Sequence, residues 1–155
     1  MSRAFVKEGS GELEPLPDLP ISPHPNYVTP RGLAALRDRL AAAQSTLTLL
    51  RTRAERLDKL PEAAADRDIR YLQARLKSAI LVDVAAQGTE TVAFGHAVTV
   101  LDGKGHSATY QITGEDEADA AHGRIAPQSP LARALLGGLG GRCRHLEAPR
   151  RRGRA

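Results

Sequence analysis

The sequence predicts an α+β protein in which an antiparallel α-helical coiled-coil hairpin precedes a small β-rich domain with one short helix. Two segments repeat leucine or alanine at alternating steps of three and four residues, as coiled-coil helices do. After Gly88, short runs rich in valine and threonine alternate with glycine-containing turns, as in a strand region. The 155 residues include two Phe, three Tyr and no Trp, so aliphatic side chains must form the core.

Residues 1–27 are predicted to be a disordered, proline-rich leader. Five prolines occur from Pro15 to Pro25 among glycine, serine and acidic residues. Because proline lacks an amide hydrogen and fixes φ, such a stretch is extended and packs poorly. It also lacks the continuous apolar run of a signal peptide, and no later run approaches the roughly 18 apolar residues of a membrane span. We therefore expect a cytoplasmic protein with no membrane partner.

The coiled-coil hairpin is predicted over residues 28–84. Thr29-Pro30 reads as an N-cap followed by proline at the first helical position. The heptad positions that follow are Leu33, Leu36, Leu40, Ala43, Leu47, Leu50, Ala54 and Leu57. Leu60-Pro61 interrupts the pattern, because proline disfavours the α region for the residue before it. A second series runs through Ile69, Leu72, Leu76 and Ala79 to near Asp83. The two helices could belong to a larger bundle, but no comparable third helix follows, which favours a hairpin.

The β-rich domain is predicted over residues 90–140. Apolar residues from Val92 to Val100 form a strand region, and Asp102-Gly103 marks a turn. Further strands are expected at Ala108–Thr113 and at Arg124–Ala126. Ser129-Pro130 then begins a short helix, Leu131–Leu136, which Gly137-Gly138 ends.

The formal net charge of +4 comes from the C-terminal end. Residues 142–155 contain six arginines and one glutamate, which leaves 16 of the 22 basic and 17 of the 18 acidic residues elsewhere. We expect residues 141–155 to form a disordered basic tail, and the alternative is a nucleic-acid contact through Arg150–Arg154. The single cysteine, Cys143, excludes an internal disulfide and fits a reducing compartment.

Several segments resemble the GreA/GreB transcription elongation factors. Phe94–Val100 resembles the strand that opens their C-terminal domain, and Tyr110–Asp119 resembles the next strand and its acidic turn. Ser129–Gly137 is similar to the most recognisable segment of the family, and Ile69–Asp83 is similar to the returning arm of its coiled coil. The resemblance covers about residues 28–140.

The resemblance implies an FKBP-like C-terminal domain on the rim of the RNA polymerase secondary channel, with the coiled coil directed toward the active site. It implies that Gln128, Ser129, Pro130 and Arg133 bind polymerase, with Gln128 in place of the usual acidic residue. Family members carry two acidic tip residues that help hold the polymerase's second Mg²⁺ and its attacking water, as hard oxygen ligands can. The chain itself is then expected to be a monomer with no cofactor and no metal of its own. It is also expected to have no enzymatic activity, because the polymerase performs the hydrolysis.

The predicted tip departs from the family, because it has no Glu-Asn-Ala core and both arms look shorter by roughly two turns, or about 10 Å. The carboxylates near the turn are Asp58, Glu62, Asp66 and Asp68. They form either a rebuilt acidic tip, in which Glu62 and Asp66 contact the polymerase Mg²⁺, or helix punctuation. In the second case the negative charge of Glu62 interacts favourably with the helix dipole, while Arg67 and Arg70 partly neutralise the aspartates. We assign no catalytic residue and expect inefficient stimulation of transcript cleavage.

The chain also departs from the family after Gly137, where a closing strand would follow. Gly138–Leu146 keeps little alternating apolar pattern, so we expect an open sheet edge and lowered stability.

The leading functional hypothesis is an RNA-polymerase-binding regulator, and the alternative is a short-hairpin regulator of nucleoside diphosphate kinase type that acts through protein contacts. A prolyl isomerase is a third class, disfavoured by the shortage of aromatic residues to line a pocket. The scattered histidines fit surface positions better than ligand positions; they are His24, His96, His106, His122 and His145.

Overall fold

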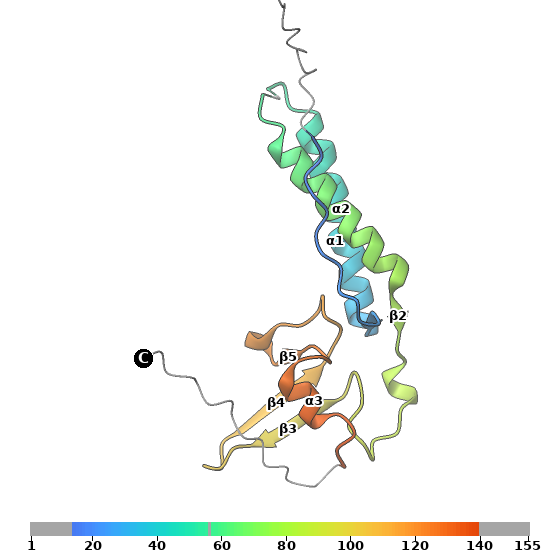
Figure 1. Cartoon of the computed structure of the whole chain (residues 1–155), viewed down its shortest axis with the longest axis vertical. Helices are drawn as coiled ribbons and strands as arrows, with labels where there is room; N and C mark the ends of the chain where they lie inside the picture. The colour runs from blue at the N-terminus through green and yellow to red at the C-terminus, as the bar shows by residue number, and fades with distance from the viewer. Residues whose placement is uncertain (1–13, 56, 140–155) are drawn as a thin grey trace, which may run out of the picture. The chain divides into compact units, whose positions relative to one another are not determined.

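The computed structural model describes residues 14–55 and 57–139 of the chain. Its architecture is α+β, as the sequence predicts, with two long helices followed by short strands and one short helix (Figure 1). The elements in chain order are β1 (Tyr27–Val28), α1 (Pro30–Arg51), α2 (Leu60–Ser78), β2 (Ile80–Leu81), η1 (Val84–Ala86), β3 (Ala97–Leu101), β4 (Ser107–Ile112), η2 (Ala120–His122), β5 (Arg124–Ile125) and α3 (Pro130–Leu135), where η marks a single 3-10 turn. Within the described residues no helix is both long and apolar enough to cross a membrane.

Two compact units make up the chain. The hairpin unit comprises Met1–Pro23 and Leu36–Lys77, and the β unit comprises His24–Ala35 and Ser78–Ala155. Helix α1 therefore begins in the β unit and continues into the hairpin unit. Parallel pairing of β1 with β2 places both ends of the predicted hairpin segment in the β unit, so the boundary precedes the expected one near residue 84.

Helix α1 begins where the sequence predicts. The Thr29 hydroxyl accepts a hydrogen bond from the Gly32 amide at 3.0 Å, and the Thr29 carbonyl accepts one from Leu33 at 2.9 Å. These bonds satisfy amides that a helix start leaves without partners, and Pro30 at the first helical position has no amide hydrogen to satisfy. The predicted N-cap is therefore confirmed.

In the hairpin unit α1 and α2 run alongside each other in opposite directions (Figure 1). An ion pair between Arg51 Nη2 of α1 and Asp66 Oδ2 of α2, 3.4 Å apart, joins the helices near the turn. The aliphatic side chains that this unit buries are Leu36, Leu47, Ala65 and Leu72. All but Ala65 lie at predicted heptad positions, so the coiled-coil period correctly identifies the contact face.

The hairpin turn differs from the prediction at both sides. Helix α1 ends at Arg51, although the heptad pattern continues to Leu57, which is 93% exposed. The Thr52 hydroxyl donates to the Leu49 carbonyl at 2.8 Å and helps to close the last turn. Helix α2 begins at Leu60, so Pro61 stands in its first turn, where a missing amide hydrogen costs nothing. An apolar period alone does not extend a helix where no facing helix lies opposite.

The described part of the leader contacts the hairpin. Arg70 of α2 donates from Nε to Asp18 Oδ1 at 2.6 Å and from Nη2 to the Leu16 carbonyl at 2.9 Å. Figure 1 shows this segment, coloured blue, following the helices. The composition predicted a disordered, poorly packed leader and did not predict these contacts. They form because the extended backbone leaves a carbonyl free to accept from an arginine. Residues 1–13 lie outside the described residues.

The β unit contains a three-stranded sheet in the order β3-β4-β5, with β3 antiparallel and β5 parallel to β4. The second and third predicted strands are confirmed. The first begins only at Ala97, because Gly95, at φ +87°, turns the chain just before it. Helix α3 is also confirmed, and Gly137 follows it at φ +75°.

The core of the β unit is aliphatic, as the composition predicts. Ile112, Ile125, Ala132 and Leu135 are its buried residues, at most 9% exposed. The half-buried residues packed around them are Val92, Phe94, Val98, Val100, Tyr110, Leu131 and Leu136. Because Ala132 and Leu135 belong to α3, this core fixes α3 against the sheet.

Candidate functional site

The four residues predicted to bind polymerase lie together in and just before the first turns of α3. The Ser129 hydroxyl accepts from the Ala132 amide at 3.2 Å, Pro130 is the first helical residue, and the Arg133 side chain is exposed. Since Ala132 is fully buried, the turn that carries Pro130 and Arg133 on its outer side rests on the core. Such a turn is a well-supported element for binding a partner.

Gln128, which precedes the Ser-Pro pair, faces inward at its polar end. Its Oε1 atom is buried and has no hydrogen-bond partner among the described residues. A glutamate at the same place would bury a negative charge, whereas the neutral amide avoids most of that cost. Replacing the usual acidic residue with glutamine therefore fits the local environment of this turn.

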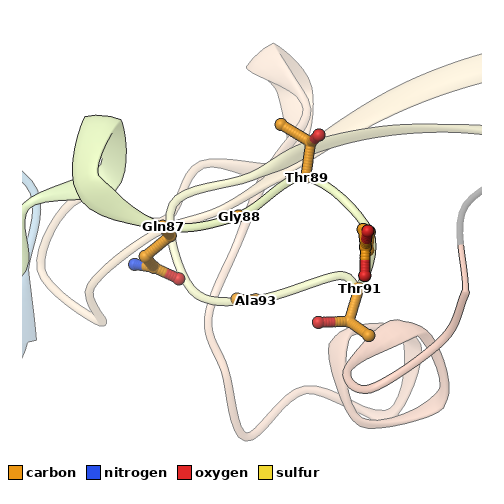
Figure 2. Close-up of a pocket in the computed structure, with 6 residues that line it drawn as sticks. Gln87, Gly88, Thr89, Thr91 and Ala93 are labelled. Atoms are coloured by element: carbon orange, nitrogen blue, oxygen red, sulfur yellow. The ribbon is translucent and has the colours of Figure 1, made fainter.

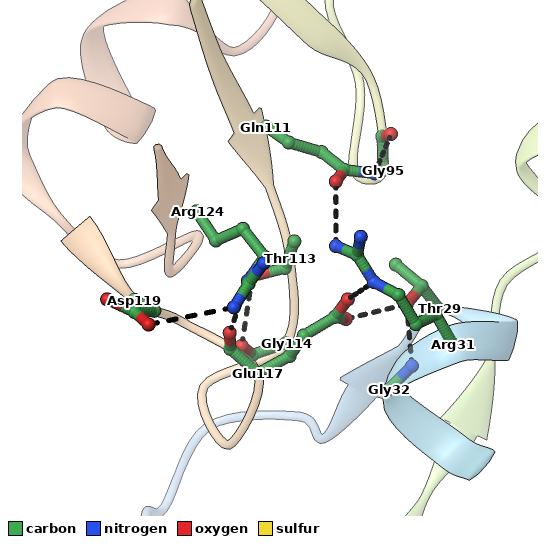
Figure 3. A network of polar contacts seen from close by, with 10 residues as sticks. All are labelled: Thr29, Arg31, Gly32, Gly95, Gln111, Thr113, Gly114, Glu117, Asp119 and Arg124. Carbon is green, nitrogen blue, oxygen red and sulfur yellow. Dashed lines mark hydrogen bonds and ion pairs between the residues drawn. The ribbon is translucent and has the colours of Figure 1, made fainter. Parts of the chain in front are cut away.

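The acidic turn after β4 forms a polar network with the start of α1 (Figure 3). Glu117 accepts a hydrogen bond from the Thr29 hydroxyl at 2.6 Å and pairs with Arg31 Nε at 2.7 Å. Arg31 Nη2 also donates to Gln111 Oε1 at 3.0 Å, and Gln111 Nε2 donates to the Gly95 carbonyl at 3.2 Å. The Glu117 side chain is 8% exposed and that of Arg31 59%. The network thus ties the first turn of α1 to β4 and to the start of β3.

Two glycines allow the segments of this network to approach each other. A Cβ atom on Gly32 would lie 2.6 Å from Glu117 Oε2, and one on Gly114 would lie 2.6 Å from the Tyr27 carbonyl oxygen. Both distances are well inside van der Waals contact. A larger residue at position 32 would displace the Glu117 carboxylate, and one at position 114 would push the acidic turn away from β1.

Two aspartates bind histidines in exposed turns. The side chain of His122 hydrogen-bonds Asp119 at 2.6 Å and lowers the pKa of that carboxyl. The backbone N–H of His106, and then its side chain at 3.0 Å, lower the pKa of Asp102. These histidines are surface residues that shape turns, in agreement with the sequence interpretation.

The Asp102 carboxyl is expected to titrate below its ordinary value of 3.8. Its hydrogen bonds stabilise the turn fully above that value, and the contribution is lost as the pH falls through the lowered pKa. An NMR titration of the chain should show this. His106→Ala should raise the pKa of Asp102 only partly, because the backbone bond remains, whereas His24→Ala should leave it unchanged. An unchanged Asp102 pKa in the His106 variant would refute the side-chain contribution.

Three of the four carboxylates of the predicted tip form hydrogen bonds or ion pairs within the hairpin, and the fourth, Glu62, is buried. Asp58 Oδ1 accepts from the Leu60 amide at 2.9 Å at the start of α2, and Glu62 is 8% exposed in its first turn. Asp66 pairs with Arg51, and Asp68 pairs with Arg67 at 3.3 Å. The expected neutralisation by Arg70 is wrong, because that side chain binds the leader instead.

Nothing in the described residues gathers these carboxylates into a metal site, since no group of three or more His, Cys, Asp or Glu could hold an ion there. The large apolar residues exposed around the turn are Leu49, Leu57 and Leu60. Asp58 and Glu62 lie at the start of α2, where helix punctuation places acidic groups.

The comparisons with known proteins agree with the sequence resemblance. The family model described as "Transcription elongation factor, GreA/GreB, C-term" matches residues 87–152. Transcription elongation factor GreA of Nitrobacter winogradskyi is 34% identical over 143 residues, which cover 79% of this chain and 87% of that protein. The chain belongs to the GreA/GreB family.

Further GreA/GreB relatives differ in how much of the chain they match. GreB of Neisseria meningitidis is 34% identical over 127 residues, covering 72% of this chain and 78% of that protein. GreB of Xanthomonas axonopodis is 47% identical over 72 residues, covering 46% of this chain and 43% of that protein. Among solved structures, GreA factor homolog 1 of Thermus thermophilus has a TM-score of 0.31 at 22% identity, over 75% of this chain and 85% of that one.

In this GreA/GreB-family chain, sequence patterns identified the Ser129 cap but missed the role of Glu117. An acidic residue within Glu115-Asp116-Glu117 reads as solvent-exposed, so nothing local marks it as buried. The signal that could have found it is Gly32, a glycine within the first turn of a helix, where close approach of another segment is a common reason.

Proposed function

We propose that this chain is an RNA-polymerase-binding regulator of transcription elongation that inserts its helical hairpin into the secondary channel. The α3 turn carries this proposal, because Ser129, Pro130 and Arg133 lie on a capped turn fixed to the core. The same turn falls in the family-matched segment 87–152. A rigid, outward-facing turn can bind a protein rim with little loss of conformational freedom.

We infer that the chain stimulates transcript cleavage poorly. Asp66 and Asp68 are paired with arginines, and Asp58 binds the backbone at the start of α2. Holding a second Mg²⁺ would require carboxylates that converge on one point with free oxygens. The chain would occupy the channel as a cytoplasmic monomer and compete with other channel-binding factors. A nucleic-acid contact through residues 142–155 would lie outside the described residues.

The proposal is tested by adding the chain to stalled, backtracked elongation complexes and measuring binding and 3′ RNA cleavage separately. We expect binding, with cleavage at least about tenfold slower than with GreA of Nitrobacter winogradskyi. Replacing Ser129 and Pro130 together by alanine should weaken binding about tenfold, or about 1.4 kcal/mol, because the cap and the preformed turn are lost.

Asp66→Asn is the matched control, since it changes a hairpin carboxylate and should leave binding unaltered. Absence of binding by the unaltered chain would exclude the polymerase proposal. Pull-down with purified nucleoside diphosphate kinase would then test the alternative regulator. Cleavage as fast as with GreA would instead contradict the inference about the tip.

A further inference from the structure

Strand β3 leaves one side without a strand partner among the described residues, because it is the first strand in the order β3-β4-β5. The Asp102 amide donates to the His106 carbonyl at 2.9 Å, and the Ile112 amide donates to the His96 carbonyl at 3.1 Å. In this register the even-numbered residues of β3 exchange backbone hydrogen bonds with β4. The backbone N–H and C=O groups of Ala97, Thr99 and Leu101 therefore point outward.

A groove lies along this outward edge. A hollow of about 570 Å³ is lined by β3 and the residues just before it on one side, and by residues of the segment 84–92 on the other. No residue of β4 lines it, so it lies beside the sheet and not over a face. It shares Gln87, Thr89 and Thr91 with an adjoining hollow of about 600 Å³.

The outer wall of the groove is fixed in place. Figure 2 shows the loop leaving through Gln87 and Gly88 and returning to Ala93. The Val92 amide donates to the Gly138 carbonyl at 2.8 Å, and Gln87 Nε2 donates to the Phe94 carbonyl at 3.2 Å. These bonds hold both arms of the loop, so the groove is preformed and binding would not have to order it.

The lining of the groove specifies what it can bind. Its apolar lining includes Val84, Val92 and Val98, and the one ionisable residue that lines the 570 Å³ hollow is His96. Residues 97–101 read Ala-Val-Thr-Val-Leu and contain neither the lysine nor the proline that commonly protects a free edge. We propose that this groove is a strand-addition site for an uncharged, extended segment of a protein partner. Backbone hydrogen bonds would give affinity, and alternate apolar side chains would give selectivity.

Two other occupants fit the groove less well. A second copy of β3 would bring its own β4 with it, on the side where residues 84–92 already form the wall. The chain's own residues 140–155 contain six arginines, and the one acidic residue that lines either hollow is Glu90, so burying most of these charges there would be costly. An uncharged, extended segment from another protein could bond to the outward backbone groups of β3 without a flanking strand and without buried arginines.

The test is amide hydrogen exchange on the full ¹⁵N-labelled chain with the probe peptide acetyl-Thr-Val-Thr-Val-Thr-amide. The peptide should slow exchange of the Ala97, Thr99 and Leu101 amides at least about tenfold. It should leave Val98 and Val100 unchanged, because their amides already bond to β4. A peptide methylated on alternate backbone nitrogens should give no protection. Thr99→Pro removes one outward N–H and should abolish the effect, whereas Thr99→Val should keep it.

Three results would overturn the proposal. The peptide could leave all three outward amides unprotected in the full chain. The amides could already be protected without peptide and independently of concentration, which would make the chain's own residues the occupant. Protection without peptide that rises with protein concentration would make a second copy the occupant. Should Thr99→Pro fail to fold, the methylated peptide decides the question.

Discussion

Replacing Ile112 with alanine should lower the free energy of unfolding of the β unit by about 3–4 kcal/mol. The Ile112 side chain has no exposed surface and lies among Ile125, Ala132 and Leu135 in the core. Removing buried aliphatic groups loses their transfer free energy and leaves a cavity, and Ile→Ala in cores typically costs about 2–5 kcal/mol. Denaturant titration followed by circular dichroism measures the loss as a shift of the unfolding midpoint.

Leu101→Ala is the matched control for this prediction. It removes an isomeric aliphatic side chain from the same sheet, but Leu101 is 65% exposed, so the change should stay within about 0.5 kcal/mol. Polymerase binding should weaken in the Ile112 variant as stability falls, because the α3 turn rests on the same core. A cost below about 1 kcal/mol for Ile112→Ala would mean that this residue is not central to the packing.

Local signals predicted most of the elements correctly. Thr29-Pro30 and Ser129-Pro130 both cap helices, because a hydroxyl before proline satisfies an early amide wherever the helix lies. Asp102 begins the turn between β3 and β4, where its carboxylate accepts from the Lys104 and His106 amides. Each of these contacts joins residues within four positions of one another, so the sequence contains all the information they need.

Contacts between distant segments were not predictable in the same way. β1 and β2 are two residues long each and pair across more than 50 positions, so neither shows a recognisable period. Arg70 was expected to neutralise a neighbouring aspartate, yet it binds Asp18, 52 positions away. The choice among several acidic partners depends on which backbone lies opposite, and residue spacing does not give that.

In the candidate site, too, contacts between near neighbours in sequence were predicted and contacts between distant segments were not. The Ser129 turn is local and was found, whereas the network around Glu117 joins residues 86 and 88 positions apart and was missed. The tip carboxylates were located by sequence, but the pairing of Asp66 with Arg51 and of Asp58 with the Leu60 amide was not. Whether side chains from distant segments meet at one point depends on how those segments pack, and residue spacing does not give this.

Replacing Glu117 with alanine should lower the free energy of unfolding by about 2–3 kcal/mol, which is the second large effect that we expect. The Thr29 hydroxyl is buried and would lose its acceptor at 2.6 Å, which costs about 1–3 kcal/mol. Arg31 is 59% exposed, so its share of the ion pair is screened by water and adds at most about 1 kcal/mol. Thermal unfolding should therefore shift downward by roughly 5–10 °C.

A second variant and a control separate this network from general surface effects. Gly32→Ala should give a loss of similar direction, because its methyl group would displace the same carboxylate. Glu90→Ala removes an exposed carboxylate from the same unit and should change stability by less than about 0.5 kcal/mol. If Glu117→Ala and Glu90→Ala were equally mild, the bonds to Thr29 and Arg31 would contribute little. The start of α1 would then be held to the β unit chiefly by the backbone pairing of β1 with β2.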